Sequence, residues 1–210
     1  MKTLRILMLL ASFAVAGSAS ATTVTLSSTG TLSQADAVDF LFIEVTGPTI
    51  FSAITFGYAG GTQADGNIVA DGGFDPILSL FSPSGSLITS NDDGGLAVNA
   101  DPVSGARFDS FISDTLLTTG NYLLAISQFS NFAIGPEFFN GFDGSGRTEF
   151  IDVFQNLRTS AYAIDVTLST VPVPAAGILF ASALLGAGVF GRRKKKAAKS
   201  EMVGAFARVS

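Results

Sequence analysis

Between residues 22 and 170, clusters of Gly, Asn, Asp and Ser divide the sequence into short runs rich in Val, Ile, Phe, Thr and Tyr. Such runs are typical of β-strands, and the clusters between them are typical of turns. No stretch of this region carries a helical period of convincing length. The pattern therefore predicts an all-β domain, a sandwich of antiparallel strands. The expected strands are 22–28, 38–46, 50–58, 77–81, 87–90, 108–117, 122–128, 148–154 and 160–169.

Phe supplies much of the expected core. Fifteen of the 19 Phe residues lie in this domain, and burying each one contributes on the order of 2 to 3 kcal/mol. Trp, which is common on sugar-binding faces, is absent from the chain, so most Phe residues are assigned to the core. One group is expected either to form an exposed patch or to belong to a long loop folded back over one sandwich edge. This group consists of Phe129, Phe132, Phe138, Phe139 and Phe142.

The first 21 residues have the organisation of a secretory signal peptide. Lys2 and Arg5 precede a short apolar core, and Ala19 and Ala21 provide the small residues of an A-x-A cleavage site. A first transmembrane helix is the alternative, but the apolar core is short and no charged stop follows it. We expect signal peptidase to cleave after Ala21.

A second apolar segment lies near the C-terminus. The uncharged residues 175–191 follow Pro172 and Pro174 and precede the basic block 192–196. As a helix with a rise of about 1.5 Å per residue, this segment spans roughly 25 Å, slightly less than a hydrocarbon core of about 30 Å. The positive-inside rule keeps the basic block in the cytoplasm, so the preceding domain is exported. We expect a single transmembrane helix followed by a cytoplasmic tail, 197–210.

This C-terminal segment resembles the PEP-CTERM sorting signal in its V-P-x-P-A variant. The matching residues are Val171, Pro172, Pro174, Ala175 and a basic stop that begins with Arg192 and Arg193. The resemblance implies a protein of a Gram-negative, exopolysaccharide-producing bacterium, processed by an exosortase, a membrane-bound cysteine transpeptidase. The expected location is therefore the membrane, through the C-terminal helix, and then the cell surface or extracellular matrix. Two departures are Val173, where the namesake motif has Glu, and the long tail.

The exported domain is strongly acidic. It contains 16 Asp and Glu residues against three Arg (Arg107, Arg147 and Arg158), which gives a formal charge near −13. Such a charge repels nucleic acids and anionic membrane surfaces, so these partners are not expected. The chain also has no Cys and no His, which excludes zinc centres, Cys nucleophiles and Ser-His-Asp arrangements. We therefore expect a noncatalytic protein with a structural or adhesive role in the envelope or exopolysaccharide matrix.

The densest set of acidic residues suggests a second hypothesis. If the turn before Ile77 and the turn after Ser90 end a hairpin-connected pair of strands, their carboxylates approach one another and could ligate Ca²⁺. The alternative is that Asp and Asn accept backbone N–H groups within the turns. The proposed ligands are Asp71, Asp75, Asn91, Asp92 and Asp93, with Asp101 in the same acidic set. A calcium-dependent glycan-binding or surface-protein-binding module is thus the second functional candidate.

A third candidate is a carboxylate-pair hydrolase. A glycosidase needs two carboxyl groups separated by roughly 5 to 9.5 Å, and residue type alone permits Asp92 with Glu137 or Glu149. The scarcity of Tyr and the absence of Trp disfavour it, because substrate clefts need aromatic side chains for stacking.

A second resemblance covers most of residues 30–165. The region resembles exported bacterial β-sandwich domains related to the bacterial pre-peptidase C-terminal domain. The matching pieces are Gly73-Phe74-Asp75-Pro76, Ser82-Pro83-Ser84-Gly85, Asn91-Asp92-Asp93, Phe108-Asp109-Ser110 and Gly120-Asn121-Tyr122. The resemblance implies a noncatalytic accessory module with a jelly-roll-like fold.

Overall fold

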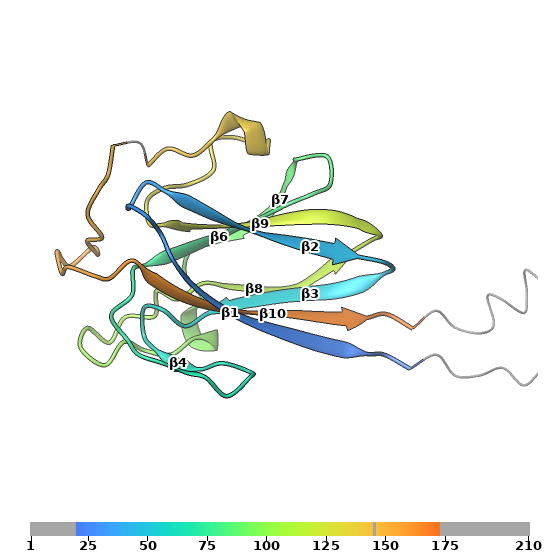
Figure 1. The fold of residues 1–210 in the computed structure, drawn as a ribbon, viewed down its shortest axis with the longest axis horizontal. Helices are drawn as coiled ribbons and strands as arrows, with labels where there is room; N and C mark the ends of the chain where they lie inside the picture. Colours follow the sequence, from blue (N-terminus) through green and yellow to red (C-terminus); the bar gives the residue numbers. More distant parts are fainter. Residues whose placement is uncertain (1–19, 145, 173–210) are drawn as a thin grey trace, which may run out of the picture. The chain divides into compact units, whose positions relative to one another are not determined.

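The computed structural model describes residues 20–144 and 146–172, and residues 21–171 form one compact unit. In the described part of the chain the regular elements are β-strands and two short 3₁₀ turns, with no α-helix (Figure 1). The predicted all-β sandwich of antiparallel strands is therefore confirmed. Ala19 and most of the expected signal peptide lie outside the described residues, as do Pro174, Ala175, Arg192, Arg193 and the rest of the C-terminal segment.

The sandwich consists of two four-stranded antiparallel sheets. The first sheet, called here the β1 sheet, has the order β1 (Thr23–Thr31), β10 (Ala161–Thr170), β3 (Thr49–Thr55) and β8 (Phe111–Leu117). The second, the β2 sheet, has the order β2 (Val38–Val45), β9 (Gly120–Gln128), β6 (Pro76–Phe81) and β7 (Leu87–Asn91). The smaller elements are β4 (Gly61–Thr62), β5 (Ile68–Val69), η1 (Gly95–Ala97) and η2 (Phe138–Asn140).

Eight of the nine expected strands match these long strands. The expected strand at 148–154 is wrong, because the chain turns at Asp152, whose Oδ1 accepts the N–H groups of Phe154 and Asn156 at 2.9 Å each. This region forms only an isolated bridge, Ile151 to Leu157. The small hairpin β4–β5 was not expected from the sequence, because its two-residue strands are too short to show a period.

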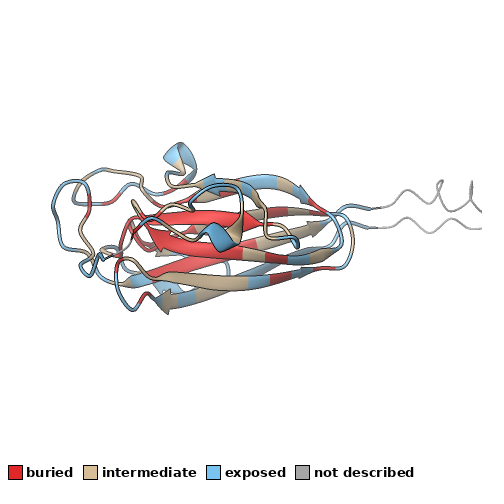
Figure 2. Cartoon of the chain, turned by 90° about the horizontal axis from the view of Figure 1, so that it is seen from above, coloured by how far each residue is buried: buried red, intermediate tan, exposed pale blue. Residues whose placement is uncertain are grey.

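The core lies between the two sheets. In β3 buried and half-buried residues alternate along the strand, which is the pattern of a strand with one face on the core. In β6 every residue is buried, since the strand lies between β9 and β7 and both of its faces are covered. Burial is deepest in the centre of the sandwich (Figure 2), in a cluster that includes Phe51, Leu78 and Ile164.

The long loop after β9 covers part of the outer face of the β2 sheet. The ring of Phe138 packs edge-on against Phe40 and Phe81, with centroids 5.4 and 5.6 Å apart. Phe142 contacts the same two rings at 6.4 Å. The expectation of a loop folded back over the sandwich is confirmed for these two residues, whereas Phe139 is 76% exposed.

The short connections between strands lie at one end of the sandwich, and the long connections lie at the other end. The turns at 46–48, 82–86 and 118–119 join strands at one end, where β1 begins and β10 ends. The four long connections leave the strands at the other end, called here the loop end (Figure 1). These connections are 32–37, 56–75, 92–110 and 129–160. Because loops placed by a rigid scaffold often carry function, the loop end is the place to look for a site.

The described residues contain no helix that is long and apolar enough to cross a membrane.

Candidate functional site

Three of the long loops meet around the guanidinium group of Arg158. Arg158 Nη1 lies 3.2 Å from Asp101 Oδ1, and Arg158 Nη2 lies 2.9 Å from Asp152 Oδ2. Its Cζ atom is 3.9 Å from the centroid of the Tyr58 ring, which is a cation–π geometry. Because Tyr58, Asp101 and Asp152 belong to the loops after β3, β7 and β9, this ion-pair network ties the three loops together.

Both carboxylates of the network are buried and ionised. Burial raises the pKa of Asp101, but hydrogen bonds from Arg158 and Ser104 outweigh it and hold this pKa below its usual value. Burial also raises the pKa of Asp152, but N–H groups of Asn156, Arg158 and Phe154 hold it below its usual value. Since the oxygens of both groups are occupied by donors, the network is a structural device. Asp101, which the sequence grouped with the possible calcium ligands, is committed to Arg158.

Asp109 is a third buried carboxylate with a structural task. Its oxygens accept hydrogen bonds from Thr55 Oγ1 at 2.8 Å, Tyr58 N at 3.2 Å and Ala59 N at 2.9 Å. Burial raises the pKa of Asp109, and these hydrogen bonds limit the rise. The side chain thus fixes the course of the chain immediately after β3.

Asp75, directly before β6, differs from these acids. It is 4% exposed, and its Oδ1 has no hydrogen-bond partner among the described residues. Burial, together with the negative charges of Asp93 and Asp92, raises the pKa of Asp75 to about 8. Asp75 is therefore a buried carboxyl group surrounded by acids and lacking a donor.

The start of β6 and the end of β7 lie side by side, as the sequence predicted for a hairpin-connected pair. Leu78 pairs with Asn91 in the antiparallel register. Ser110 Oγ lies 2.6 Å from the carbonyl oxygen of Pro76 and 2.7 Å from that of Asn91, and so bridges the two strands. This arrangement brings Asp75 next to the turn that begins with Asp92.

The proposed calcium ligands are only partly brought together. Asp92 is half-buried and Asp93 is exposed beside Asp75, and burial and the charge of Asp92 raise the pKa of Asp93. Asn91 is engaged, because its Oδ1 accepts the N–H of Phe111 at 2.8 Å. In residues 20–144 and 146–172 no three acidic side chains are grouped closely enough to hold a metal ion as they stand.

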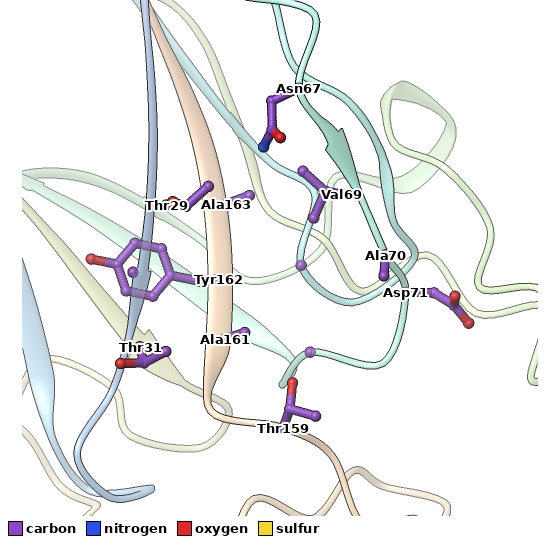
Figure 3. A pocket seen from close by; sticks show the side chains of 13 residues that line it. Thr29, Thr31, Asn67, Val69, Ala70, Asp71, Thr159, Ala161, Tyr162 and Ala163 are labelled. Atoms are coloured by element: carbon purple, nitrogen blue, oxygen red, sulfur yellow. The ribbon is translucent and has the colours of Figure 1, made fainter.

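Asp71 belongs to a different part of the loop end. It is exposed and lines a hollow of about 500 Å³ beside β10, together with Asn67, Thr159 and Tyr162. Figure 3 shows Asp71 at the far side of this hollow from Tyr162, after the small hairpin. Between Asp71 and Asp75 the chain passes from the β1 sheet to the β2 sheet. Gly73 N donates to Gly57 O, just after β3, at 2.8 Å, and Asp75 directly precedes β6.

The carboxylate pairs expected for a hydrolase are not assembled. Glu137 accepts a hydrogen bond from Ser86 Oγ at 3.0 Å, at the hairpin turn before β7. Asp92 follows the other end of β7, and five strand residues at about 3.3 Å each separate the two acids by more than the range that such enzymes use. Glu149 is exposed and lines a hollow with Gln128 and Gln155, to which Asp92 does not contribute.

Sequence reasoning did not single out Arg158, Ser110 or Gln128. Gln128, the last residue of β9, is 4% exposed, and its Oε1 is a second buried acceptor without a partner among the described residues. Pro76 pairs with Gln128, so this acceptor lies on the strand next to Asp75. Arg158 could have been noticed in the sequence because cationic side chains are rare there: residues 22–170 contain only three.

Comparison with models of known protein families and with curated proteins gave no match.

Proposed function

We propose that this chain is an exported, noncatalytic β-sandwich protein, held at the cell surface through its C-terminal segment and handed to an exosortase-like enzyme. The observation that carries the proposal is where the chain enters and leaves the sandwich. Thr23 pairs with Ser169 at the end with the short turns, and Val171 N donates to Pro48 O at 2.8 Å at the same end. The segment that begins with Pro172 therefore follows directly from the end opposite the four long loops.

The strand order supports the jelly-roll part of the second resemblance. Successive long strands alternate between the two sheets except at the β6–β7 hairpin, and each sheet contains four strands. This strand order supports an eight-stranded double-sheet jelly roll. Such a module fits a domain that displays loops at one end and is attached by the other.

The chemistry of the loop end favours display or binding over catalysis. Asp101, Asp109 and Asp152 are each occupied by donors within the protein. Catalytic groups need a carboxyl that can reach a substrate, and the separated positions of Asp92 and Glu137 do not provide a pair. A binding module for a glycan, a surface protein or the exopolysaccharide matrix is the second candidate. The buried carboxyl group of Asp75, whose Oδ1 has no partner among the described residues, favours a role for a cation in such a module.

Mass spectrometry of the mature surface protein tests the export proposal. We expect an N-terminus near Thr22, after signal peptidase has acted at Ala21, and a C-terminus near Pro174. A surface-exposed protein with an intact tail to Ser210 would contradict processing.

A double variant, Pro172→Ala with Pro174→Ala, should accumulate in the membrane with its C-terminal segment uncut. Pro83→Ala, in the hairpin turn 82–86 of the sandwich, is the matched control and should be processed normally. For the binding candidate, a glycan array without signal in the presence of calcium would count against a lectin.

A further inference from the structure

We propose that Asp75, with Asp93 and Asp92 of the turn after β7, forms a Ca²⁺-binding site at the loop end of the sandwich. The starting point is the cost of burying a carboxylate. An ionised carboxylate in a protein interior is tolerated only when it is paired, hydrogen-bonded or bound to a metal. Asp75 is 4% exposed and its Oδ1 has no partner among the described residues, so the protein alone favours the neutral carboxyl group, and a bound cation would supply the missing stabilisation of the carboxylate.

The surroundings of Asp75 attract a cation. Among the charges that act on it, those of Asp93 and Asp92 have the largest effect, followed by Asp109 and Asp152. Arg158, one of the three arginines in the loops at this end of the sandwich, is shared by Asp101 and Asp152 and is therefore already neutralised. An added positive charge at Asp75 would relieve both the burial of this carboxylate and its repulsion from the neighbouring acids.

The backbone frame of the site is fixed by hydrogen bonds, whereas the exposed side chain of Asp93 can adapt. Ser110 Oγ bridges Pro76 O and Asn91 O, which holds the two strand ends at a fixed spacing. Asp93 is exposed, so its side chain can turn toward Asp75 without disturbing the core, whereas its main chain is held by hydrogen bonds from Asn91 Nδ2 to Asp93 O at 3.1 Å and from Gly94 N to Asp109 O at 2.8 Å. The separation of the acids in the described structure is therefore consistent with a site that closes on its ion.

The ligand chemistry favours calcium among divalent cations. Every side-chain atom that could ligate an ion at this site is an oxygen, and the chain has no His or Cys for zinc. Ca²⁺ accepts six to eight oxygens in flexible geometry, including carbonyl groups and waters, whereas Mg²⁺ demands a near-ideal octahedron. Gln128 Oε1, the other buried acceptor without a partner, lies on the neighbouring strand and adds to the oxygen-rich character of this end. This inference concerns the folded sandwich and does not depend on export or processing.

The test is thermal unfolding of the full-length chain, followed by circular dichroism, in EDTA, CaCl₂, MgCl₂ and NaCl of matched ionic strength. At a calcium concentration about a hundredfold above Kd, we expect Tm to rise by about 5 °C or more relative to EDTA. Isothermal titration calorimetry should give one binding event per chain. An equal rise in NaCl would show that screening of the acidic surface is responsible, and would overturn the proposal.

The variants Asp75→Asn and Asp93→Asn should each abolish the calcium-dependent rise and the calorimetric signal. Asp93 is exposed, so its variant is expected to fold even if Asp75→Asn does not. Asp114→Asn is the matched control, because Asp114 is an exposed strand residue and its loss removes the same charge. A flat calcium response of the unmodified protein, or a full response in Asp75→Asn or Asp93→Asn, would overturn the proposal.

Discussion

Replacing Arg158 by Met tests whether the ion-pair network stabilises the loop end. The side chain of Arg158 is 7% exposed, and those of Asp101 and Asp152 are 0% exposed. Met retains an unbranched stem that can pack on the Tyr58 ring, but it removes the positive charge and all donors. The variant therefore leaves two buried carboxylates without their common cation.

The expected loss of stability is large for a single substitution. Removing one partner of a buried ion pair costs about 3 to 5 kcal/mol. Part of this is avoided, because Asp101 keeps its hydrogen bond from Ser104 N at 2.7 Å and Asp152 keeps that from Asn156 N at 2.9 Å. We expect a decrease of about 4 kcal/mol in the free energy of unfolding, out of a total of about 5 to 15 kcal/mol.

Urea unfolding followed by circular dichroism measures this decrease. Arg147→Met is the matched control, because Arg147 is exposed and its Nη1 donates to Ser130 Oγ at 2.5 Å. The control should change stability by less than about 0.5 kcal/mol. A decrease below about 1 kcal/mol for Arg158→Met, or equal decreases for the two variants, would refute the reasoning.

The pH dependence identifies the electrostatic part of the effect. In the unmodified protein the pKa values of Asp101 and Asp152 lie below the ordinary value of 3.8. Their stabilising contribution is thus fully present above about pH 4 and is lost as the pH falls through the folded-state pKa values. Without Arg158 the two carboxyl groups take up protons at higher pH, so the stability difference between the proteins should shrink from pH 7 to pH 3. A difference that stays constant over this range would indicate lost packing instead.

Two further substitutions test the packing of the sandwich. Gly30→Ala should destabilise the fold by about 1 to 3 kcal/mol, because a Cβ at Gly30 would lie 2.4 Å from the ring of Tyr162. Gly47→Ala is the control, because a Cβ at Gly47 would have nothing within 4 Å, and equal losses would contradict the steric explanation. Phe138→Ala combined with Phe142→Ala should release the loop after β9 from the β2 sheet while the sandwich stays folded, so trypsin should cleave at Arg147 faster than at Arg107. Unchanged relative rates of cleavage at the two sites would show that the rings do not hold the loop.

The strands themselves could be predicted from the sequence. Short β-branched and aromatic runs between turn residues are local signals, because the side-chain period of a strand and the backbone preferences of turns depend on neighbouring residues. The turn residues at Ser82 to Gly85 likewise predict the β6–β7 hairpin, and with it the approach of Asp75 to Asp92 and Asp93. The expected strand at 148–154 was wrong for the same reason: its run of Phe, Ile and Val resembles a strand locally, and the turn is imposed by the hydrogen bonds of Asp152.

The sequence by itself determined the fold class, the acidic character of residues 22–170 and the lack of Cys and His side chains. Only the tertiary structure decided what each acid does. Arg158 meets Asp101 across 57 positions of the chain, whereas Asp71, four positions before Asp75, lies in a separate hollow. The physical reason is that the state of a carboxyl group depends on its burial and on the donors and charges around it, and these come from distant segments that meet only when the sheets pack.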